Sequence, residues 1–250
     1  MKIYLINARK ILSGTKVVIV VSALALISAL LFGIVASSYN SEGDGAAVNA
    51  GVNKVIIIDP GHGGEDSGAI GVSGRLEKDL NLEMALLIGE ELAQKGFTVV
   101  YTRTEDKMLY SPEENIKGIR KISDLKNRCA KSFEYEDPIF VSVHMNSYGS
   151  SKYSGLQVYY TPNSDQSTSL ARSIQSTVHQ KVQNDNKRQI KKGSNLYLLE
   201  NCNGTAVLIE CGFLSNLAEC EKLSEKEYQK ELSFAIVCGI IDYVEQNNAS

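Results

Sequence analysis

The chain lacks any pair of cysteines in a CxxC arrangement, and its five cysteines are an odd number at irregular spacing. A disulfide framework uses paired cysteines and a thiolate zinc site uses closely spaced ones, so neither is expected here. Most of the five are therefore predicted to be small buried hydrophobic side chains, although one pair could be bridged outside the cell and the sequence does not say which. They are Cys129, Cys202, Cys211, Cys220 and Cys238.

Acidic residues are absent before Glu42, whereas the same N-terminal part carries four bases, Lys2, Arg9, Lys10 and Lys16. The remainder of the chain holds 22 basic and 29 acidic residues, a net charge of −7. Nucleic-acid binding depends on Lys and Arg side chains that neutralise phosphates. An acidic body of this kind therefore argues against a nucleic-acid partner.

A long apolar run follows these bases. Residues 17–36 contain only two serines as polar side chains, and about 20 apolar residues are enough to span a bilayer as a helix. The positive-inside rule then makes residues 1–16 a cytoplasmic segment and places the rest of the chain outside the cell. A cleaved signal peptide is the alternative, because small side chains at Ala36 and Ser37 permit cleavage, but its apolar core is usually about 7–15 residues long. We favour a membrane anchor, and both interpretations export the body of the protein.

Residues 37–53 are small and polar and include glycines, which is typical of a flexible linker. Strand and helix patterns then alternate to the end of the chain, without an internal repeat. This alternation predicts one α/β domain over 54–250 with a mostly parallel sheet. The expected strands are 55–58, 97–101, 139–143, 155–160, 196–199 and 206–209, and the expected helices are 77–94, 111–131, about 164–182 and 225–245, with Asn216 capping another helix.

Three of these apolar strands are followed directly by residues with catalytic chemistry. His62 follows the first strand in the loop Asp59-Pro60-Gly61-His62, His144 follows the strand 139–143, and Glu210 follows the strand 206–209. In an open parallel sheet, ligands bind beyond the carboxyl ends of the strands. If the three strands are neighbours, the three side chains point into one crevice, which is the layout of a metallohydrolase.

Catalytic zinc takes three protein ligands and a water, so a third ligand is needed beside the two histidines. Glu77 is the best candidate, because it begins the helix that follows the His62 loop, and Asp59 and Asp66 are rivals within reach. Zinc lowers the pKa of its water to about 7. A carboxylate must then carry a proton to the leaving group, and Glu210 fits that role.

Each of these residues also has a simpler interpretation when it is taken alone. His62 could be an ordinary loop residue among glycines that hold a phosphate, and Glu210 could cap a helix or form an ion pair. The third histidine, His179, falls among polar residues of an expected helix and is predicted to lie at the surface. The joint occurrence of His62, His144 and Glu210 at one sheet edge nevertheless favours a metal site.

The segments around these residues resemble zinc-dependent N-acetylmuramoyl-L-alanine amidases of the amidase-3 family. The resemblance is specific, since the segments keep the family's order and spacing over nearly all of 54–246. They are IIIDPGHGGEDSGAIG at 56–71, LEKDLNLEMA at 76–85, VVYTR at 99–103, FVSVHMNS at 140–147 and AVLIECGFLSN at 206–216.

This resemblance implies one zinc ion held by His62, Glu77 and His144, with Glu210 as the catalytic glutamate. It also implies a single α/β domain whose six-stranded sheet is flanked by helices. The implied partners are the glycan strand and stem peptide of peptidoglycan, and the implied reaction is hydrolysis of the amide between the lactyl group of N-acetylmuramic acid and L-alanine.

The chain shows no wall-binding repeat and no long inserted helix between 143 and 155 that would cover the zinc. This compact form is similar to the germination-specific, CwlD-type amidases of spore-formers, which implies a role in making muramic-δ-lactam of the spore cortex. Two alternatives stay open: a zinc peptidase that cuts within the stem peptide, and a wall-binding protein that is silent without an activating partner protein.

Two further residues are candidates for substrate binding. Arg103 follows a strand end and could pair with a carboxylate of the stem peptide, or form a structural ion pair with Asp66 or Glu105. Asn146 could orient the His144 loop or donate a hydrogen bond to the developing oxyanion.

Overall fold

In the computed structural model, residues 54–248 are described. The predicted cytoplasmic segment 1–16, the anchor or signal peptide 17–36 and the linker 37–53 lie outside this range. Among residues 54–248, no helix combines the length and apolar character that crossing a membrane requires.

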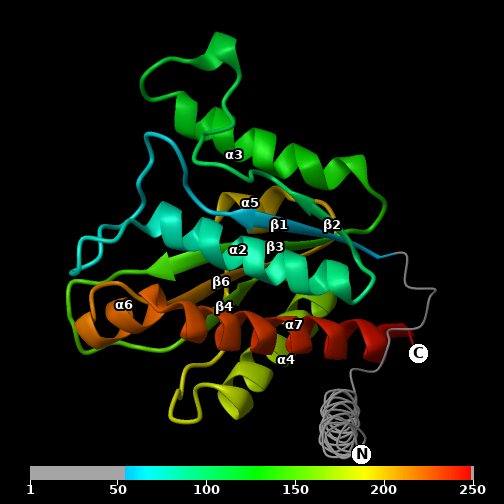
Figure 1. Ribbon diagram of the computed structural model, residues 1–250. Coiled ribbons are helices and arrows are strands. Elements are labelled where there is room, and N and C mark those ends of the chain that lie inside the picture. Colours follow the sequence, from blue (N-terminus) through cyan, green and yellow to red (C-terminus); the bar gives the residue numbers. More distant parts are fainter. Residues whose placement is uncertain (1–53, 249–250) are drawn as a thin grey trace, which may run out of the picture. The chain divides into compact units, whose positions relative to one another are not determined.

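A six-stranded sheet forms the centre of the fold, with the strand order β2-β1-β3-β6-β4-β5 (Figure 1). The strands β2, β1, β3 and β6 run parallel to one another, and β5 runs parallel to β4. Their bounds are β1 Val55–Pro60, β2 Thr98–Tyr101, β3 Ile139–Asn146, β4 Gln157–Tyr160, β5 Lys191–Lys192 and β6 Thr205–Phe213.

The expectation of a mostly parallel sheet is corrected by β4, which pairs antiparallel with β6 and makes the sheet mixed. Alternating strand and helix patterns predict the elements of a sheet but contain no signal for the direction of each strand. In the strand order β4 and β5 lie beyond β6, so β3 and β6 occupy central positions.

Helices cover both faces of the sheet (Figure 1). Strand β1 supplies both cores by simple alternation, because Ile56 and Ile58 belong to one buried cluster and Ile57 to the other. The first cluster packs against α2, α4 and α7, and the second packs against α3 and α5. The helices are α2 Glu77–Gln94, α3 Arg120–Ala130, α4 Asp165–Lys181, α5 Tyr197–Asn201, α6 Leu217–Ser224 and α7 Lys226–Asn248.

The helix predicted at 77–94 is confirmed, and Asn216 caps α6 by accepting a hydrogen bond from Glu219 N at 3.2 Å. Two other expectations are wrong. The helix predicted from 111 begins only at Arg120, because a short 3-10 turn (Pro112–Glu114) is followed by irregular backbone in which Gly118 has a φ of 90°. The strand predicted at 196–199 is instead the start of α5, since a short apolar run fits a buried helical turn equally well.

Candidate metal centre

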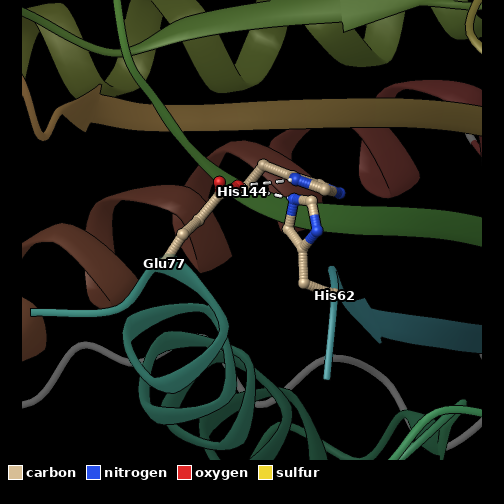
Figure 2. A group of neighbouring side chains, drawn as sticks. All are labelled: His62, Glu77 and His144. Atoms are coloured by element: carbon tan, nitrogen blue, oxygen red, sulfur yellow. Dashed lines mark hydrogen bonds and ion pairs between the residues drawn. The ribbon is translucent and has the colours of Figure 1, made fainter. Parts of the chain in front are cut away.

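The carboxyl ends of β1, β3 and β6 lie beside the first turn of α2. His62 lies just beyond β1, while His144 in β3 stands directly opposite Glu210 in β6. Glu77 is the first residue of α2, where the helix dipole favours a negative charge. Figure 2 shows His62, Glu77 and His144 converging from three different elements.

The Glu77 carboxylate contacts both imidazoles through one oxygen. Its Oε1 atom lies 3.1 Å from His62 Nε2 and 2.9 Å from His144 Nδ1 (Figure 2). One potential ligand atom from each of the three residues lies within 4.8 Å of the others. Two imidazole nitrogens and one carboxylate oxygen are a donor set found in catalytic zinc sites. These three residues therefore fit a metal ion, in agreement with the selection of Glu77 from the sequence.

Electrostatics at the centre are dominated by the two carboxylates around His62. Burial alone lowers the pKa of His62, but hydrogen bonds and charge from Asp66 and Glu77 raise it to about 9. Burial acts on Glu77 in the opposite sense, yet hydrogen bonds from His144 and His62 hold its pKa well below the usual range. Two carboxylates thus flank the His62 ring, and this is a position that suits a cation.

Two glycines leave the space that the ligands occupy. A β-carbon added at Gly61 would lie 2.2 Å from the His144 ring. At Gly68, whose φ is 64°, it would lie 2.5 Å from Glu77 Oε2 and 2.7 Å from His62 Cδ2. Only residues without a side chain allow the backbone to approach the three ligands this closely.

Hydrogen bonds fix the Glu77 carboxylate from the other side. Ala69 N donates to Oε2 at 2.7 Å, while Met145 N and Asn81 Nδ2 donate to Oε1 at 3.3 and 3.4 Å. Asn81 also donates to the carbonyl of Gly61 at 3.2 Å. The carboxylate is therefore oriented before any ion binds, as the surroundings of metal ligands generally require.

The two rival ligands proposed from the sequence have other roles. Asp59 is fully buried and accepts hydrogen bonds from Thr102 Oγ1 at 2.6 Å, Ser142 Oγ at 2.7 Å and Arg128 Nη1 at 2.8 Å. Asp66 Oδ2 lies 2.9 Å from His62 Nδ1, on the side of the ring away from Glu77. The contact is a close charge pairing, because His62 Nδ1 makes no hydrogen bond of normal geometry. Asp66 thus lies on the side of the imidazole where a carboxylate–histidine–zinc arrangement has its carboxylate.

Arg128 supports the His62 loop from α3, and the sequence did not single it out. Its guanidinium donates to the carbonyls of Pro60 at 2.7 Å and His62 at 2.6 Å, as well as to Asp59 and Asp124. His62 has a φ of 61°, in the left-handed region that residues with a β-carbon rarely adopt. A sequence signal existed only in the spacing of Asp124 and Arg128, four residues apart on one helix.

Glu210 lies beside the same centre in β6, but it takes no part in the contacts between Glu77 and the two histidines. Its Oε2 atom is buried and makes no hydrogen bond. Burial raises the pKa of Glu210 to about 7, an effect that the nearby His144 opposes and Glu77 reinforces. A carboxyl group with this pKa can both take up and release a proton near neutral pH.

The burial and the hydrogen bonds of Arg103 contradict the hypothesis that it binds substrate. The side chain is 2% exposed and donates to four backbone carbonyls, those of Pro60, Gly61, Lys78 and Glu105. The expected ion pair with Asp66 or Glu105 is also wrong, because only the backbone oxygen of Glu105 is used. Arg103 therefore positions the loop before His62 and has no free face for a ligand.

Asn146 is the last residue of β3 and follows His144 by two positions. Its backbone oxygen accepts a hydrogen bond from Leu214 N at 2.8 Å, which joins the ends of β3 and β6. His179 lies on α4, where its ring is 2.8 Å from the side chain of Gln175, and takes no part in the centre.

Comparison with known proteins agrees with this geometry. A family model described as N-acetylmuramoyl-L-alanine amidase matches residues 56–242, a span that includes all four residues of the centre. The chain belongs to the N-acetylmuramoyl-L-alanine amidase (amidase-3) family. Because the family is one of N-acetylmuramoyl-L-alanine amidases, the amidase interpretation is favoured over the stem-peptide peptidase.

Relatives of this amidase include one germination-specific enzyme. The germination-specific N-acetylmuramoyl-L-alanine amidase of Bacillus subtilis (strain 168) is 36% identical over 192 residues, which cover 76% of this chain and 79% of that protein. The CwlD amidase from Clostridioides difficile, solved in complex with the GerS lipoprotein, is 38% identical with a TM-score of 0.75, over 78% of this chain and 100% of the solved one. The N-acetylmuramoyl-L-alanine amidase from Clostridium difficile 630 is 32% identical with a TM-score of 0.68, over 77% and 97% of the two chains.

Proposed function

We propose that this amidase binds one zinc ion through His62, Glu77 and His144 and hydrolyses the amide between the lactyl group of N-acetylmuramic acid and L-alanine. The donor set, its spacing and the two glycines that make room for it support zinc as the ion. When bound, zinc supplies a Lewis acid and lowers the pKa of a coordinated water to about 7.

Glu210 carries the proton in this proposal. Its carboxylate accepts a proton from the attacking water and then delivers it to the amide nitrogen as the C–N bond breaks. An amide nitrogen is a poor leaving group until it is protonated, so this delivery is essential. The observation that carries the proposal is the buried, unpaired Oε2 atom of Glu210 together with a pKa raised to about 7.

The neighbouring residues keep the geometry fixed during the reaction. Asp66 pairs its charge with the His62 ring at Nδ1, and the backbone amides of Ala69 and Met145 hold the Glu77 carboxylate. We also propose that the Asn146 side chain donates a hydrogen bond to the oxyanion that develops on the lactyl carbonyl.

The biological setting follows from the relatives and from the N-terminal sequence. We propose that the chain is exported, is anchored in the membrane by residues 17–36 and acts in spore cortex to allow muramic-δ-lactam formation for germination. The related CwlD amidase was solved with the GerS lipoprotein, so a partner protein that promotes activity is part of this proposal.

The test uses the full-length chain, solubilised in detergent, loaded with zinc and incubated with purified peptidoglycan. Mass spectrometry should detect stem peptides with a free L-alanine amine. Glu210→Gln should bind zinc normally and lose at least about 100-fold in rate, whereas Glu221→Gln, on an exposed part of α6, should behave as wild type. Products cut within the stem peptide would contradict the proposal.

If the protein releases no products, its zinc content shows which explanation applies. A protein that holds zinc but releases nothing until a partner is added supports the partner proposal. A protein that holds no zinc and cleaves nothing under any condition would contradict the whole assignment and favour a wall-binding role.

A further inference from the structure

Two of the five cysteines meet on the face of the sheet that α3 and α5 cover. Cys129 lies in the last turn of α3, and Cys202 follows α5 directly before β6. The two thiols are close enough for each to shift the pKa of the other. Cys129 belongs to the smaller of the two buried clusters, and Cys202 packs against that cluster.

The backbones that carry the two thiols are tied together by one serine. The fully buried Ser132 donates from Oγ to the carbonyl of Cys129 at 2.7 Å and accepts at the same atom from Asn203 N at 2.8 Å. The Asn203 side chain donates to the carbonyls of Ser132 and Tyr135 at 3.3 and 3.2 Å. The two segments are thus held in register next to the thiols, without any covalent link.

The other cysteines have different surroundings. Cys211 and Cys220 are buried in the larger cluster, on the opposite face of the sheet. Cys220 Sγ lies 3.1 Å from Ser73 Oγ, and Cys238 is a half-buried residue of α7. Proximity therefore singles out Cys129 and Cys202, although they are 73 positions apart in the sequence.

We propose that Cys129 and Cys202 form a disulfide bond by exchange with an external disulfide of the glutathione type. The half-buried Cys202 thiolate attacks the external disulfide and releases one thiol. The Cys129 thiolate then attacks the mixed disulfide at the Cys202 sulfur and releases the second thiol. Two protein thiols are oxidised, and the external disulfide leaves as two thiolates that take up the two protons released by the protein thiols.

The surroundings of the pair determine how fast it reacts. Burial raises the pKa of both thiols, so the thiolate that starts the exchange is scarce at neutral pH. We expect slow oxidation near pH 7 and faster oxidation in more alkaline buffer. Once formed, a bond shielded within a packed cluster is also reduced slowly.

The bond would fix the end of α3, next to Arg128, to the start of β6. It closes a long loop that contains β3, β4 and α4. Cross-links over long loops restrict the unfolded chain most strongly, so reduction should lower the Tm by roughly 5–15 °C. Under the proposed export the chain meets an oxidising compartment, but formation of the bond in vitro depends neither on export nor on amidase activity.

The experiment starts from reduced full-length protein in detergent, which is treated with oxidised glutathione and then with an alkylating reagent. Protease digestion without reductant, followed by mass spectrometry, should identify one cross-linked pair that contains Cys129 and Cys202. Cys211, Cys220 and Cys238 should carry the alkyl group. Reductant should separate the pair and lower the Tm.

Variants make the assignment specific. Cys129→Ser and Cys202→Ser should each abolish the cross-link and the Tm difference between oxidised and reduced protein, whereas Cys238→Ser should retain both. Free Cys129 and Cys202 thiols after prolonged oxidation of folded wild-type protein at alkaline pH would overturn the proposal. A cross-link between any other pair would overturn it as well.

Discussion

Arg128 Nη1 lies 2.8 Å from Asp59 Oδ1, and both side chains are almost completely shielded from solvent. The same guanidinium donates to the carbonyls of Pro60 and His62. A buried ion pair therefore supports the loop that carries His62, which couples the stability of the fold to the geometry of the candidate centre.

Replacement of Arg128 should destabilise the protein strongly. Arg128→Met leaves Asp59 charged and buried without its partner, which typically costs about 3–5 kcal/mol in the free energy of unfolding. Urea unfolding of the metal-free protein measures this change. The control is Lys230→Met, which breaks an exposed ion pair with Glu227 and should cost less than about 1 kcal/mol. Equal effects of the two variants would show that the Arg128 network does not support the fold.

A methyl group at Gly61 should disturb metal binding more than folding. In Gly61→Ala the new β-carbon meets the His144 ring at 2.2 Å, so the ring has to move away from Glu77. We expect zinc affinity to fall at least about tenfold, as for other disturbances around metal ligands, and titration calorimetry measures it. Gly149→Ala is a matched control, because its β-carbon has nothing within 4 Å. Wild-type zinc affinity in Gly61→Ala would contradict the geometry of the centre.

Asp66 should strengthen zinc binding without being a ligand. Asp66→Asn removes the negative charge 2.9 Å from His62 Nδ1, so the imidazole loses the carboxylate that pairs with it. Losses of a carboxylate behind a ligating histidine typically weaken metal binding about 10–100-fold. Calorimetry should therefore show one zinc per chain at reduced affinity. Loss of the stoichiometry itself would instead make Asp66 a ligand, and Asp185→Asn, at an exposed position, should change nothing.

Glu210 should give the metal-free protein a distinct dependence of stability on pH. Burial raises its folded pKa to about 7 from an ordinary value of 4.5, so between these values the folded state binds the proton more tightly than the unfolded state. The protonated Glu210 therefore stabilises the folded state. This stabilisation is fully present below the unfolded pKa and is lost as the pH rises through about 7. Glu210→Gln cannot ionise at this position. Relative to this variant, the free energy of unfolding of the wild type should fall by about 1–3 kcal/mol between roughly pH 4.5 and 8.

The measurement is urea unfolding of both proteins at several pH values in the presence of a chelator. Glu221→Gln serves as the control, because its side chain is exposed. Parallel stability curves for wild type and Glu210→Gln would contradict the raised pKa.

Local patterns predicted most of the centre. The buried runs before His62, His144 and Glu210 identified three strands that turned out to be neighbours, and the leucine-rich pattern after Glu77 identified α2. These predictions succeeded because a buried strand and an amphipathic helix each leave a signal within a few residues.

The remainder depends on contacts between distant segments. Nothing near Tyr159 in the sequence indicates that β4 runs antiparallel to β6, since that direction is set by how the chain returns to the sheet. Apart from the Glu105 carbonyl, the backbone carbonyls that Arg103 and Arg128 bind are some 25 to 70 positions away. Their sequence neighbours therefore give little indication of this role. The strand end before Arg103 suggested a ligand, whereas its burial makes it a support.

The left-handed backbone of His62 has a consequence for metal affinity. A residue with a β-carbon adopts that conformation at a cost of roughly 1–2 kcal/mol, and Arg128 holds the His62 carbonyl in place there. The strain is part of the folding equilibrium and is present before an ion arrives. Under the proposed zinc binding, this loop already has the backbone conformation that places His62 beside Glu77, at the expense of conformational stability. The same three donors on a relaxed loop would hold the ion less tightly.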